Sequence, residues 1–276
     1  MSDVQISVVI PSRHRNDWLA RCLECLAPGR QTLDPSEYEV IVTDDGSNTT
    51  AESMIRERFS WVKWVSGPRR GPAANRNNGA RFARAPWIVF TDDDCIPTQG
   101  WLAAYLSASK TGSVVLEGKT VCREGFPSAL YEAPVNERGG SLWACNLMFS
   151  SDLYRELKGY DESFPFWCED MEMQNRLQRH GITPLFVPLA EVDHPPRKRA
   201  LGLKAARNWE ARVHLEKVTG ASTTGTDSMP LHIIKVRVAK AIGGKWNWGA
   251  LVMLGSGLVE FVYVLLHIVS WRKKYR

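Results

Sequence analysis

Three consecutive carboxylates, Asp92, Asp93 and Asp94, follow an apolar run in the segment FTDDDCIP, residues 90–97. Like charges this close raise the cost of keeping every group ionised, so a cation is needed nearby. Asp92 and Asp94 are one residue apart and can both face one hard cation. Mg²⁺ and Mn²⁺ take few protein ligands and fill the rest of their shells with water and substrate phosphates. The triplet therefore predicts a divalent metal and a phosphorylated ligand, with an acidic surface turn as the alternative.

The elements that must position this triplet are predicted from hydrophobic periodicity. Short β-branched or apolar runs indicate buried strands, and helical patterns alternate with them. The expected strands are residues 6–11, 38–47 (ending in two carboxylates and a turn), 61–65 and 87–91, and the expected helices lie near 17–27, 51–59 and 71–85. This alternation predicts an α/β fold, a Rossmann-like and mainly parallel sheet flanked by helices. Ligands bind such sheets beyond the carboxyl ends of the strands, where residues 11–13, 44–45 and 92–94 all fall.

Several classes of protein are disfavoured by absent patterns. No GxGxxG follows the first strand, as a nicotinamide dehydrogenase would require. Cys22 and Cys25 form a CxxC, but they lie in a helical pattern with apolar neighbours, so core packing is expected. The net charge of +5 is modest, and the basic residues gather late in the chain. Such a cluster suits nucleic acid, an anionic lipid or a phosphorylated ligand, with a solvated helix face as the alternative, and of these partners we expect no nucleic acid.

Five motifs in order resemble glycosyltransferase family 2, whose members are inverting enzymes with the GT-A fold. They are SVVIPSRHR, VIVTDDGSNTT, GPAANRNNGARFA, FTDDDCIP as the DxD motif, and WCEDMEMQNRL, and they span roughly residues 5–195. The resemblance implies a glycosyltransferase that uses a nucleotide-sugar, commonly a UDP-sugar, with Mn²⁺ or Mg²⁺. It also implies a catalytic domain over 1–218, with a nucleotide-binding half to about 110 and an acceptor half after it. A linker at 219–230 and a helical tail at 231–276 would follow.

The resemblance assigns roles to individual residues. Asp45 would lie near the nucleobase, in a pocket that Pro11 and Arg13 line, and Arg76 would lie near the nucleotide. Asp94 would be the main metal ligand. Asp92 would contact the ribose or the metal, and His194 would complete the metal shell. Asp93 is assigned to the nucleotide-sugar. A carboxylate can accept the uracil imide N–H, and arginine carries a fixed charge for phosphate.

Transfer with inversion needs a base that accepts the proton of the acceptor hydroxyl. The resemblance makes Asp170 that base, although Asp170 could equally be the N-cap of the helix that follows. Glu169 would bind the acceptor or support the loop. Trp143, Asn146 and Trp167 would flank the acceptor, since aromatic rings stack on sugars, but they also suit a protein core. The chain lacks the Gln-x-x-Arg-Trp motif of processive synthases, which predicts one sugar transferred per encounter.

Two other functions share parts of this pattern. A nucleotidyltransferase that makes sugar nucleotides has a similar sheet and acidic metal site, but it would want a glycine-rich loop where SRHRND stands. A non-catalytic module that binds nucleotide-sugars would share the binding residues and differ only in lacking turnover.

The last 46 residues are mostly apolar or basic. Residues 249–270 are long enough to cross a bilayer and have Trp248 and Trp271 at their ends. Yet Glu260 interrupts the run, and Ser256, Glu260, Tyr263, His267 and Ser270 form one polar stripe on a helix. We expect the tail to lie on a membrane surface, with a membrane span or a homodimer helix as alternatives. With no signal peptide at Met1, the expected location is cytoplasmic, peripheral on the inner face of the cell membrane, with a glycan or lipid-linked acceptor.

Overall fold

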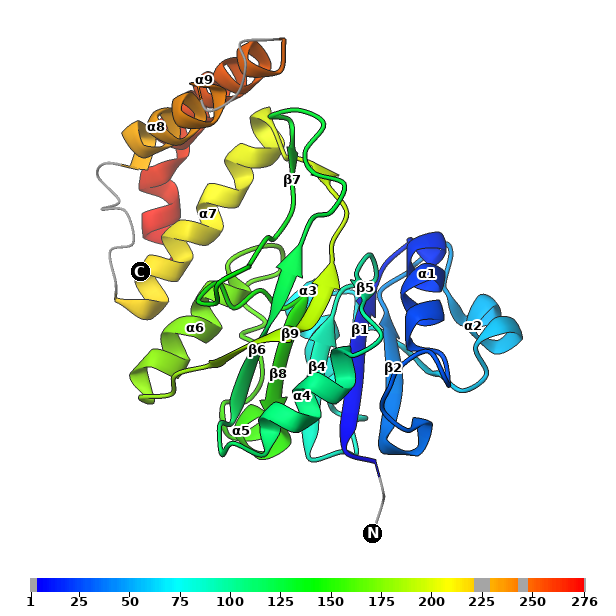
Figure 1. Ribbon diagram of the computed structural model, residues 1–276. Helices are drawn as coiled ribbons and strands as arrows, with labels where there is room; N and C mark the ends of the chain where they lie inside the picture. The colour runs from blue at the N-terminus through cyan, green and yellow to red at the C-terminus, as the bar shows by residue number, and fades with distance from the viewer. Residues whose placement is uncertain (1–3, 221–228, 243–247, 276) are drawn as a thin grey trace. The chain divides into compact units, whose positions relative to one another are not determined.

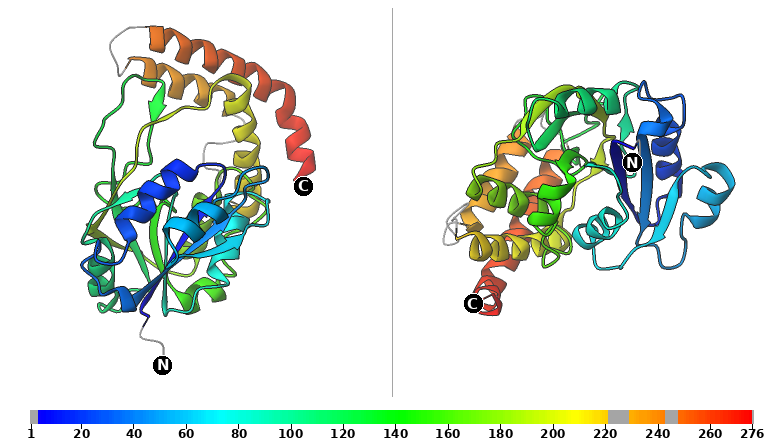
Figure 2. Two further views of the ribbon diagram at one scale, coloured as in Figure 1. Left: turned by 90° about the vertical axis from the view of Figure 1, so that its right-hand side faces the viewer. Right: turned by 90° about the horizontal axis from the view of Figure 1, so that it is seen from below.

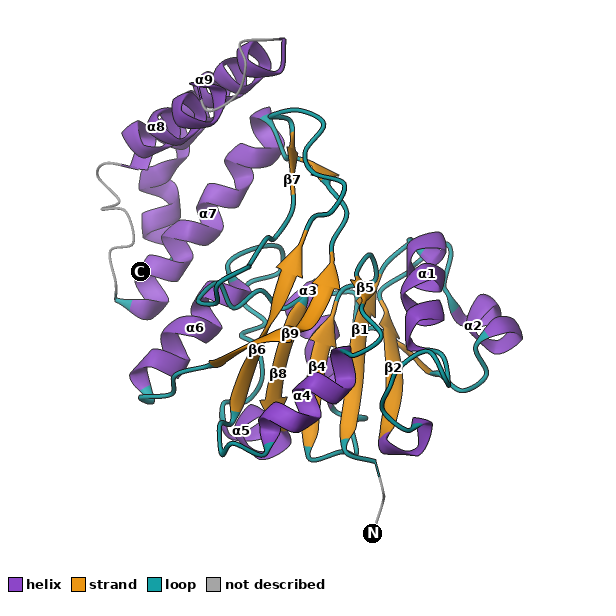
Figure 3. Ribbon diagram, viewed as in Figure 1, coloured by secondary structure: helices purple, strands orange, loops and turns teal. Residues whose placement is uncertain are grey.

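The structure is a computed structural model that describes residues 4–220, 229–242 and 248–275. Eight of the described strands form one mixed sheet with the order β3-β2-β1-β4-β8-β6-β9-β5 (Figures 1 and 3). They are β1 (Ile6–Ser12), β2 (Tyr38–Asp44), β3 (Lys63–Ser66), β4 (Trp87–Thr91), β5 (Ile96–Pro97), β6 (Val115–Val121), β8 (Asn146–Ser150) and β9 (Leu185–Asp193).

The pairing differs between the two halves of the sheet. Strands β3, β2, β1 and β4 run parallel to one another, as the sequence predicted. β8 then lies antiparallel to both β4 and β6, and β9 returns parallel to β6. The short β5 pairs antiparallel with the end of β9. The predicted α/β class is therefore confirmed, with the parallel pairing concentrated in the N-terminal half.

Helices cover both faces of the sheet because side chains along each strand point alternately to one face and the other. Val8 and Ile10 pack with α1 (Asn16–Leu26), α2 (Glu52–Arg58) and α4 (Trp101–Ser109). Val9 and Phe90 pack with α3 (Pro72–Ala80), α5 (Ser151–Glu156) and α6 (Glu169–Arg179). A short 3₁₀ helix, η1 (Pro35–Glu37), precedes β2. The strands are buried on both faces, which explains their continuous apolar runs.

Helix α3 approaches the sheet unusually closely at Gly79. A Cβ atom at this position would lie 2.5 Å from Val9 Cγ1 and 3.0 Å from Thr43 Cγ2. Glycine therefore lets α3 lie against β1 and β2. This contact fixes Asn75 and Arg76, on the same helix, relative to the strand ends.

The chain divides into two compact units. The first consists of Met1–Arg123, Pro134–Pro165 and Glu169–Pro195, and the second of Glu124–Ala133, Phe166–Cys168 and Pro196–Arg276. In the second unit β7 (Tyr131–Glu132) pairs with β10 (Arg197–Lys198). Its long helices are α7 (Gly202–Thr219), α8 (Met229–Ile242) and α9 (Trp248–Lys274), and α9 packs along both α7 and α8 (Figure 2). Most of the predicted linker, residues 221–228, lies outside the described residues, and the predicted boundary after residue 218 stays a prediction.

Candidate active site

The three carboxylates that follow β4 pair with two arginines, Asp92 with Arg76 and both Asp93 and Asp94 with Arg15. Asp92 forms an ion pair with Arg76 at 2.8 Å. Asp93 accepts a hydrogen bond from Ser12 Oγ at 2.8 Å and lies 3.1 Å from Arg15 Nη1. Asp94 pairs with Arg15 through its Oδ2 atom. Two arginines from other elements thus offset part of the charge, and the prediction that Asp92 and Asp94 share one cation remains a prediction.

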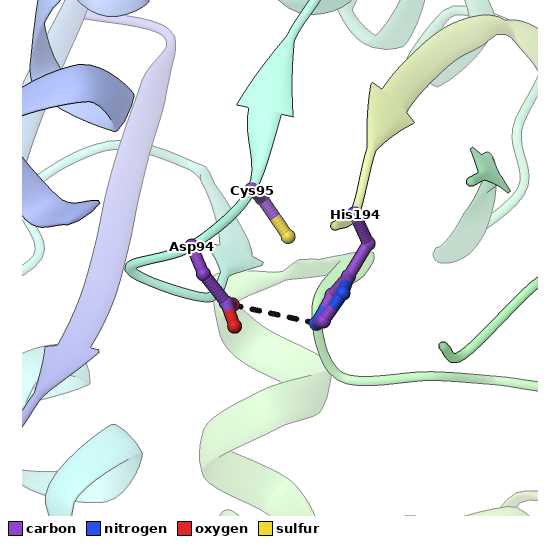
Figure 4. A group of neighbouring side chains, drawn as sticks. All are labelled: Asp94, Cys95 and His194. Atoms are coloured by element: carbon purple, nitrogen blue, oxygen red, sulfur yellow. Dashed lines mark ion pairs between the residues drawn. The ribbon is translucent and has the colours of Figure 1, made fainter. Parts of the chain in front are cut away.

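Asp94 also faces His194, which comes from the far end of the sheet (Figure 4). The β5–β9 pairing aligns Ile96 with Asp193 and so brings the acidic loop beside His194. Asp94 Oδ1 lies 3.3 Å from His194 Nε2, and both side chains are buried. Neither atom makes a hydrogen bond within the described part of the chain. Burying two polar atoms that make no hydrogen bond destabilises the folded state, unless a ligand such as a cation binds to both of them.

The ring orientation of His194 suits a metal ligand. Its Nδ1 atom lies 2.8 Å from the carbonyl oxygen of Pro195. A carbonyl oxygen can only accept a hydrogen bond, so Nδ1 must carry the hydrogen that is donated. The Nδ1–H tautomer is thereby favoured, and Nε2 keeps its lone pair directed at Asp94. Asp94, Cys95 and His194 each place one potential ligand atom within 4.8 Å of the others. These residues fit a divalent cation, although the Cys95 thiol also contacts the carbonyl oxygen of Cys145.

Arg76 is buried and connects the acidic loop to α6. Its guanidinium lies 2.8 Å from Asp92 Oδ1 and 3.1 Å from Glu169 Oε1. The sequence assigned Arg76 to the nucleotide, but the structure shows it between these two acids. In this position it holds the start of α6 against the loop that follows β4.

Asp170 lies inside the first turn of α6, because the helix begins at Glu169. It is therefore not the N-cap, the structural alternative considered from the sequence. Asp170 Oδ2 accepts a hydrogen bond from the Ala144 amide at 3.3 Å, while its buried Oδ1 makes none among the described residues. Burial, and then the negative charge of Glu169, raise the pKa of Asp170 to about 8. A carboxyl group with a raised pKa is a stronger base, as general-base catalysis requires.

The ends of β1 and β2 form a second polar group. Their parallel register places Pro11 opposite Thr43 and Ser12 opposite Asp44, with Asp45 directly after. Asp44 fixes the loop that follows β2, since its carboxylate accepts hydrogen bonds from the amides of Gly46 and Ala51. Asp45 instead accepts one from the Arg69 amide at 2.8 Å. Burial raises the pKa of Asp45, and the backbone amides of Arg69 and Gly71, followed by the positive charge of Arg13, partly counter that effect.

Gly67 leaves room for the side chains of Asp45 and Asn75. A Cβ atom there would lie 2.2 Å from Asp45 Oδ1 and 2.5 Å from Asn75 Oδ1. Any larger residue at position 67 must displace the carboxylate that the sequence assigns to the nucleobase.

The structure corrects the assignment of Asn146 to the acceptor. Asn146 is buried, and its Oδ1 accepts hydrogen bonds from Trp101 Nε1 and the Tyr105 hydroxyl, each at 2.8 Å. Its Nδ2 donates to the carbonyl oxygens of Lys119 and Ala190, each at 2.9 Å. All of its hydrogen-bonding capacity is used, so Asn146 joins α4, β6 and β9 and is not free to bind a ligand.

Asn146→Ala is therefore expected to destabilise the fold by about 2–4 kcal/mol, because it leaves several buried polar groups without partners. Urea unfolding measures this change in the free energy of unfolding. Asn78→Ala is the matched control, since the Asn78 amide is only half buried. An equal, small loss in both variants would contradict the structural role of Asn146.

The two tryptophans assigned to the acceptor lie in different units. Trp143 is half-buried in the first unit, where its Nε1 donates to the Val135 carbonyl oxygen at 3.3 Å. Trp167 belongs to the second unit and packs edge-on against Trp209, with ring centroids 6.4 Å apart. Their acceptor role stays a prediction.

Arg15, Ser12 and Cys95 were not predicted as site residues, although the structure places all three against the acidic triplet. Arg15 and Ser12 belong to SVVIPSRHR, the motif that contains most of the first strand and the start of the loop after it. Arg15 could have been found from the sequence, because it is a second arginine two positions after Arg13 in the loop that follows β1.

Known proteins with similar sequences are glycosyltransferases. Validoxylamine A glucosyltransferase of Streptomyces hygroscopicus subsp. limoneus is 29% identical over 222 residues, which cover 64% of this chain and 48% of that protein. Chondroitin synthase of Escherichia coli is 36% identical over 105 residues, covering 37% of this chain and 15% of that protein. The chain thus spans about half the length, or less, of these curated relatives.

Solved structures share the fold at low sequence identity. The crystal structure of S. aureus TarS 1-349 in complex with UDP-GlcNAc has a TM-score of 0.61 and 15% identity, covering 99% of this chain and 89% of that one. The structure of TarS 1-349 without that ligand has a TM-score of 0.59 and 14% identity, over the same shares. This likeness concerns the fold, which is the GT-A fold that the motifs predicted.

Family models cover most of the first unit. Residues 7–137 match the model of glycosyl transferase family 2, and residues 126–197 match that of the N-terminal domain of galactosyltransferase. The first match contains the strand-end loops and the acidic triplet, and the second contains Glu169, Asp170 and His194. In sequence, fold and site the chain therefore resembles glycosyl transferase family 2, whose model matches residues 7–137, just under half of its length.

Proposed function

We propose that this protein is an inverting, metal-dependent glycosyltransferase that moves one sugar from a UDP-sugar to a hydroxyl of a glycan or lipid-linked acceptor. One observation carries the proposal. Three buried atoms of one charged cluster, Asp94 Oδ1, His194 Nε2 and Asp170 Oδ1, make no hydrogen bond among the described residues. Arg76 links the two parts through Asp92 and Glu169. A cation site and a strong base in one cluster are what glycosyl transfer from a diphosphate needs.

The donor would bind across the carboxyl ends of β1, β2 and β4. Asp45 would accept the imide N–H of the nucleobase, with Pro11 and Arg13 beside it. The preference for UDP draws support from the structurally similar TarS, which has been solved in complexes with UDP and with UDP-GlcNAc. Arg15 carries a charge that suits the diphosphate, and its side chain is 40% exposed.

Asp94 and His194 would hold the metal ion, with Asp92 available from the same loop. When bound, the ion neutralises the negative charge that develops on the departing diphosphate. The Asp94 carboxylate oxygen suits both Mn²⁺ and Mg²⁺, and the His194 imidazole nitrogen favours the transition metal Mn²⁺ over the harder Mg²⁺. Arg15 would release Asp94 Oδ2 as the ligand binds and keep its contact with Asp93.

Asp170 would act as the general base. The acceptor oxygen forms a bond to the anomeric carbon while the bond from that carbon to the diphosphate breaks on the opposite face. The hydroxyl proton passes to the Asp170 carboxylate, and UDP leaves with the bonding electron pair. This single displacement inverts the configuration and needs no covalent enzyme intermediate.

A panel of nucleotide-sugars with Mn²⁺, scored by thermal shift, tests the donor assignment. The true donor is expected to stabilise the fold by about 2.7 kcal/mol at roughly 100 times its Kd, which raises Tm by several degrees. A chelator should remove most of that shift, and GDP- and dTDP-sugars are the controls. Stabilisation that does not respond to the chelator, or none with any UDP-sugar, would contradict the proposal. Turnover with the identified donor then separates an enzyme from a non-catalytic binding module.

A further inference from the structure

The outward side of α9 is an uninterrupted apolar surface. Leu251, Leu258, Val262, Leu265, Leu266 and Val269 are 47 to 74% exposed, and apart from the adjacent pair Leu265 and Leu266 successive members are three, four or seven residues apart. This spacing places them on one face of the helix, which we call the outer face of α9. Exposed apolar patches of this length on a soluble unit mark a binding surface.

The polar stripe that the sequence showed on this helix begins on the opposite side. Glu260 is fully buried and pairs with Arg237 of α8 at 2.6 Å. Its carboxylate also accepts hydrogen bonds from Ser256 Oγ at 2.7 Å and from Trp209 Nε1 of α7 at 3.1 Å. The one charged residue between Gly249 and Trp271 is therefore neutralised inside the unit. Glu260 no longer argues against contact between the outer face and hydrocarbon.

Charge along the chain is strongly unequal. Residues 196–276 contain fifteen Lys and Arg against four Asp and Glu, a net charge of +11. Residues 1–195 contain twenty against twenty-six, a net charge of −6. Arg272, Lys273 and Lys274 lie in the last turn of α9, and Trp248, at its start, is 77% exposed. A tryptophan and a basic cluster at the ends of an apolar helix face match the interfacial region of an anionic bilayer.

We propose that the outer face of α9 docks on an anionic lipid surface, with the helix lying in the plane of the interface. A membrane span is disfavoured because α9 packs along α7 and α8. Inserting it would carry the charged residues of α7, among them Lys204, Arg207 and Arg212, into hydrocarbon. A second copy of the chain is disfavoured because two surfaces with a charge of +11 would repel each other.

Vesicle flotation with the purified full chain tests this docking without using activity. We expect binding to vesicles of phosphatidylcholine with phosphatidylglycerol, weaker binding to phosphatidylcholine alone, and release as the salt concentration rises. The double variant Leu258→Glu/Leu266→Glu should bind anionic vesicles at least about tenfold more weakly, since each charge must leave water to reach the acyl region. Lys273→Glu should reduce the preference for the anionic vesicles.

Leu189→Glu is the matched control, because Leu189 is 77% exposed but lies on β9 in the first unit. It should bind vesicles like the wild type, and all variants should keep the wild-type Tm. Undiminished vesicle binding by the double variant would overturn the proposal, as would binding that ignores lipid charge. Light scattering that showed a dimer broken by the double variant, without vesicle binding, would assign the face to a second copy. Resistance to alkaline carbonate extraction would assign α9 to a membrane span.

Discussion

Replacement of Asp170 by asparagine is expected to lower kcat by roughly 10²- to 10⁴-fold and to leave nucleotide-sugar binding unchanged. Asparagine preserves the shape of the side chain and the contact with the Ala144 amide, but it cannot accept the proton of the acceptor hydroxyl. Single-turnover kinetics at saturating donor and acceptor measure the loss, and isothermal calorimetry measures donor affinity. For the wild type, kcat/KM should rise with pH, reach half of its maximum near pH 8, and level off above that pH as Asp170 becomes fully ionised.

The same substitution should stabilise the fold. Burial raises the pKa of Asp170 from 3.8 to about 8, so the folded chain holds a proton that the unfolded chain releases above pH 4. The stability that this group contributes is present below pH 4 and is lost as the pH rises through 8. Asp170→Asn should therefore have a higher Tm than the wild type, by a margin that grows between pH 4 and 8.

Glu172→Gln is the matched control for Asp170. Glu172 lies on the same helix and is buried, but it pairs with Arg176 at 2.6 Å and not with the acidic cluster. Its substitution should leave kcat near the wild-type value. A wild-type rate in Asp170→Asn, or an equal loss in both variants, would remove Asp170 from the role of base.

Asp94→Asn is expected to lower kcat/KM by about 10³-fold and to abolish the Mn²⁺-dependent part of the thermal shift. The neutral amide is a poorer ligand than the carboxylate, and losing charge stabilisation of the departing diphosphate raises the barrier by about 4 kcal/mol. Titration of the protein with Mn²⁺ in the presence of UDP measures the loss of metal affinity directly.

The variant Asp93→Asn tests whether Asp93 is a metal ligand or only a charged neighbour of the metal site. Asp93 is buried between Ser12 and Arg15, and burial raises its pKa to about 7. Its carboxylate faces these two residues, so the variant should retain Mn²⁺ affinity. If Asp93→Asn lost the metal and Asp94→Asn kept it, the two neighbours would exchange roles.

The N-terminal half of the fold could be predicted because short stretches of sequence are enough to mark its strands and their ends. Continuous apolar runs mark strands buried on both faces, and the carboxyl ends of β1, β2 and β4 gather Arg13, Asp45 and the acidic triplet at one edge. The second half was harder, since β8 enters antiparallel between β4 and β6 and no pattern in its five residues shows its direction.

Residues that depend on distant pairing were the ones missed or misassigned. The sequence analysis placed Asn146 on the acceptor side, yet four groups from three other elements use its amide. Cys95 became relevant only through β5 and β9, which align over just two residue pairs. Sequence periodicity cannot detect so short a pairing. In contrast, the polar stripe on α9 was visible in the sequence, but its buried partners on α7 and α8 were not.

The buried position of Arg76 has a consequence for laboratory evolution of acceptor choice. Because its guanidinium contacts Asp92 on one side and Glu169 on the other, substitutions near the start of α6 are expected to disturb residues that we propose serve the donor. Beneficial changes on the two sides should show epistasis, with combined effects that differ from the sum of the single ones. Libraries that vary positions 92, 76 and 169 together should therefore recover active variants that stepwise searches would discard.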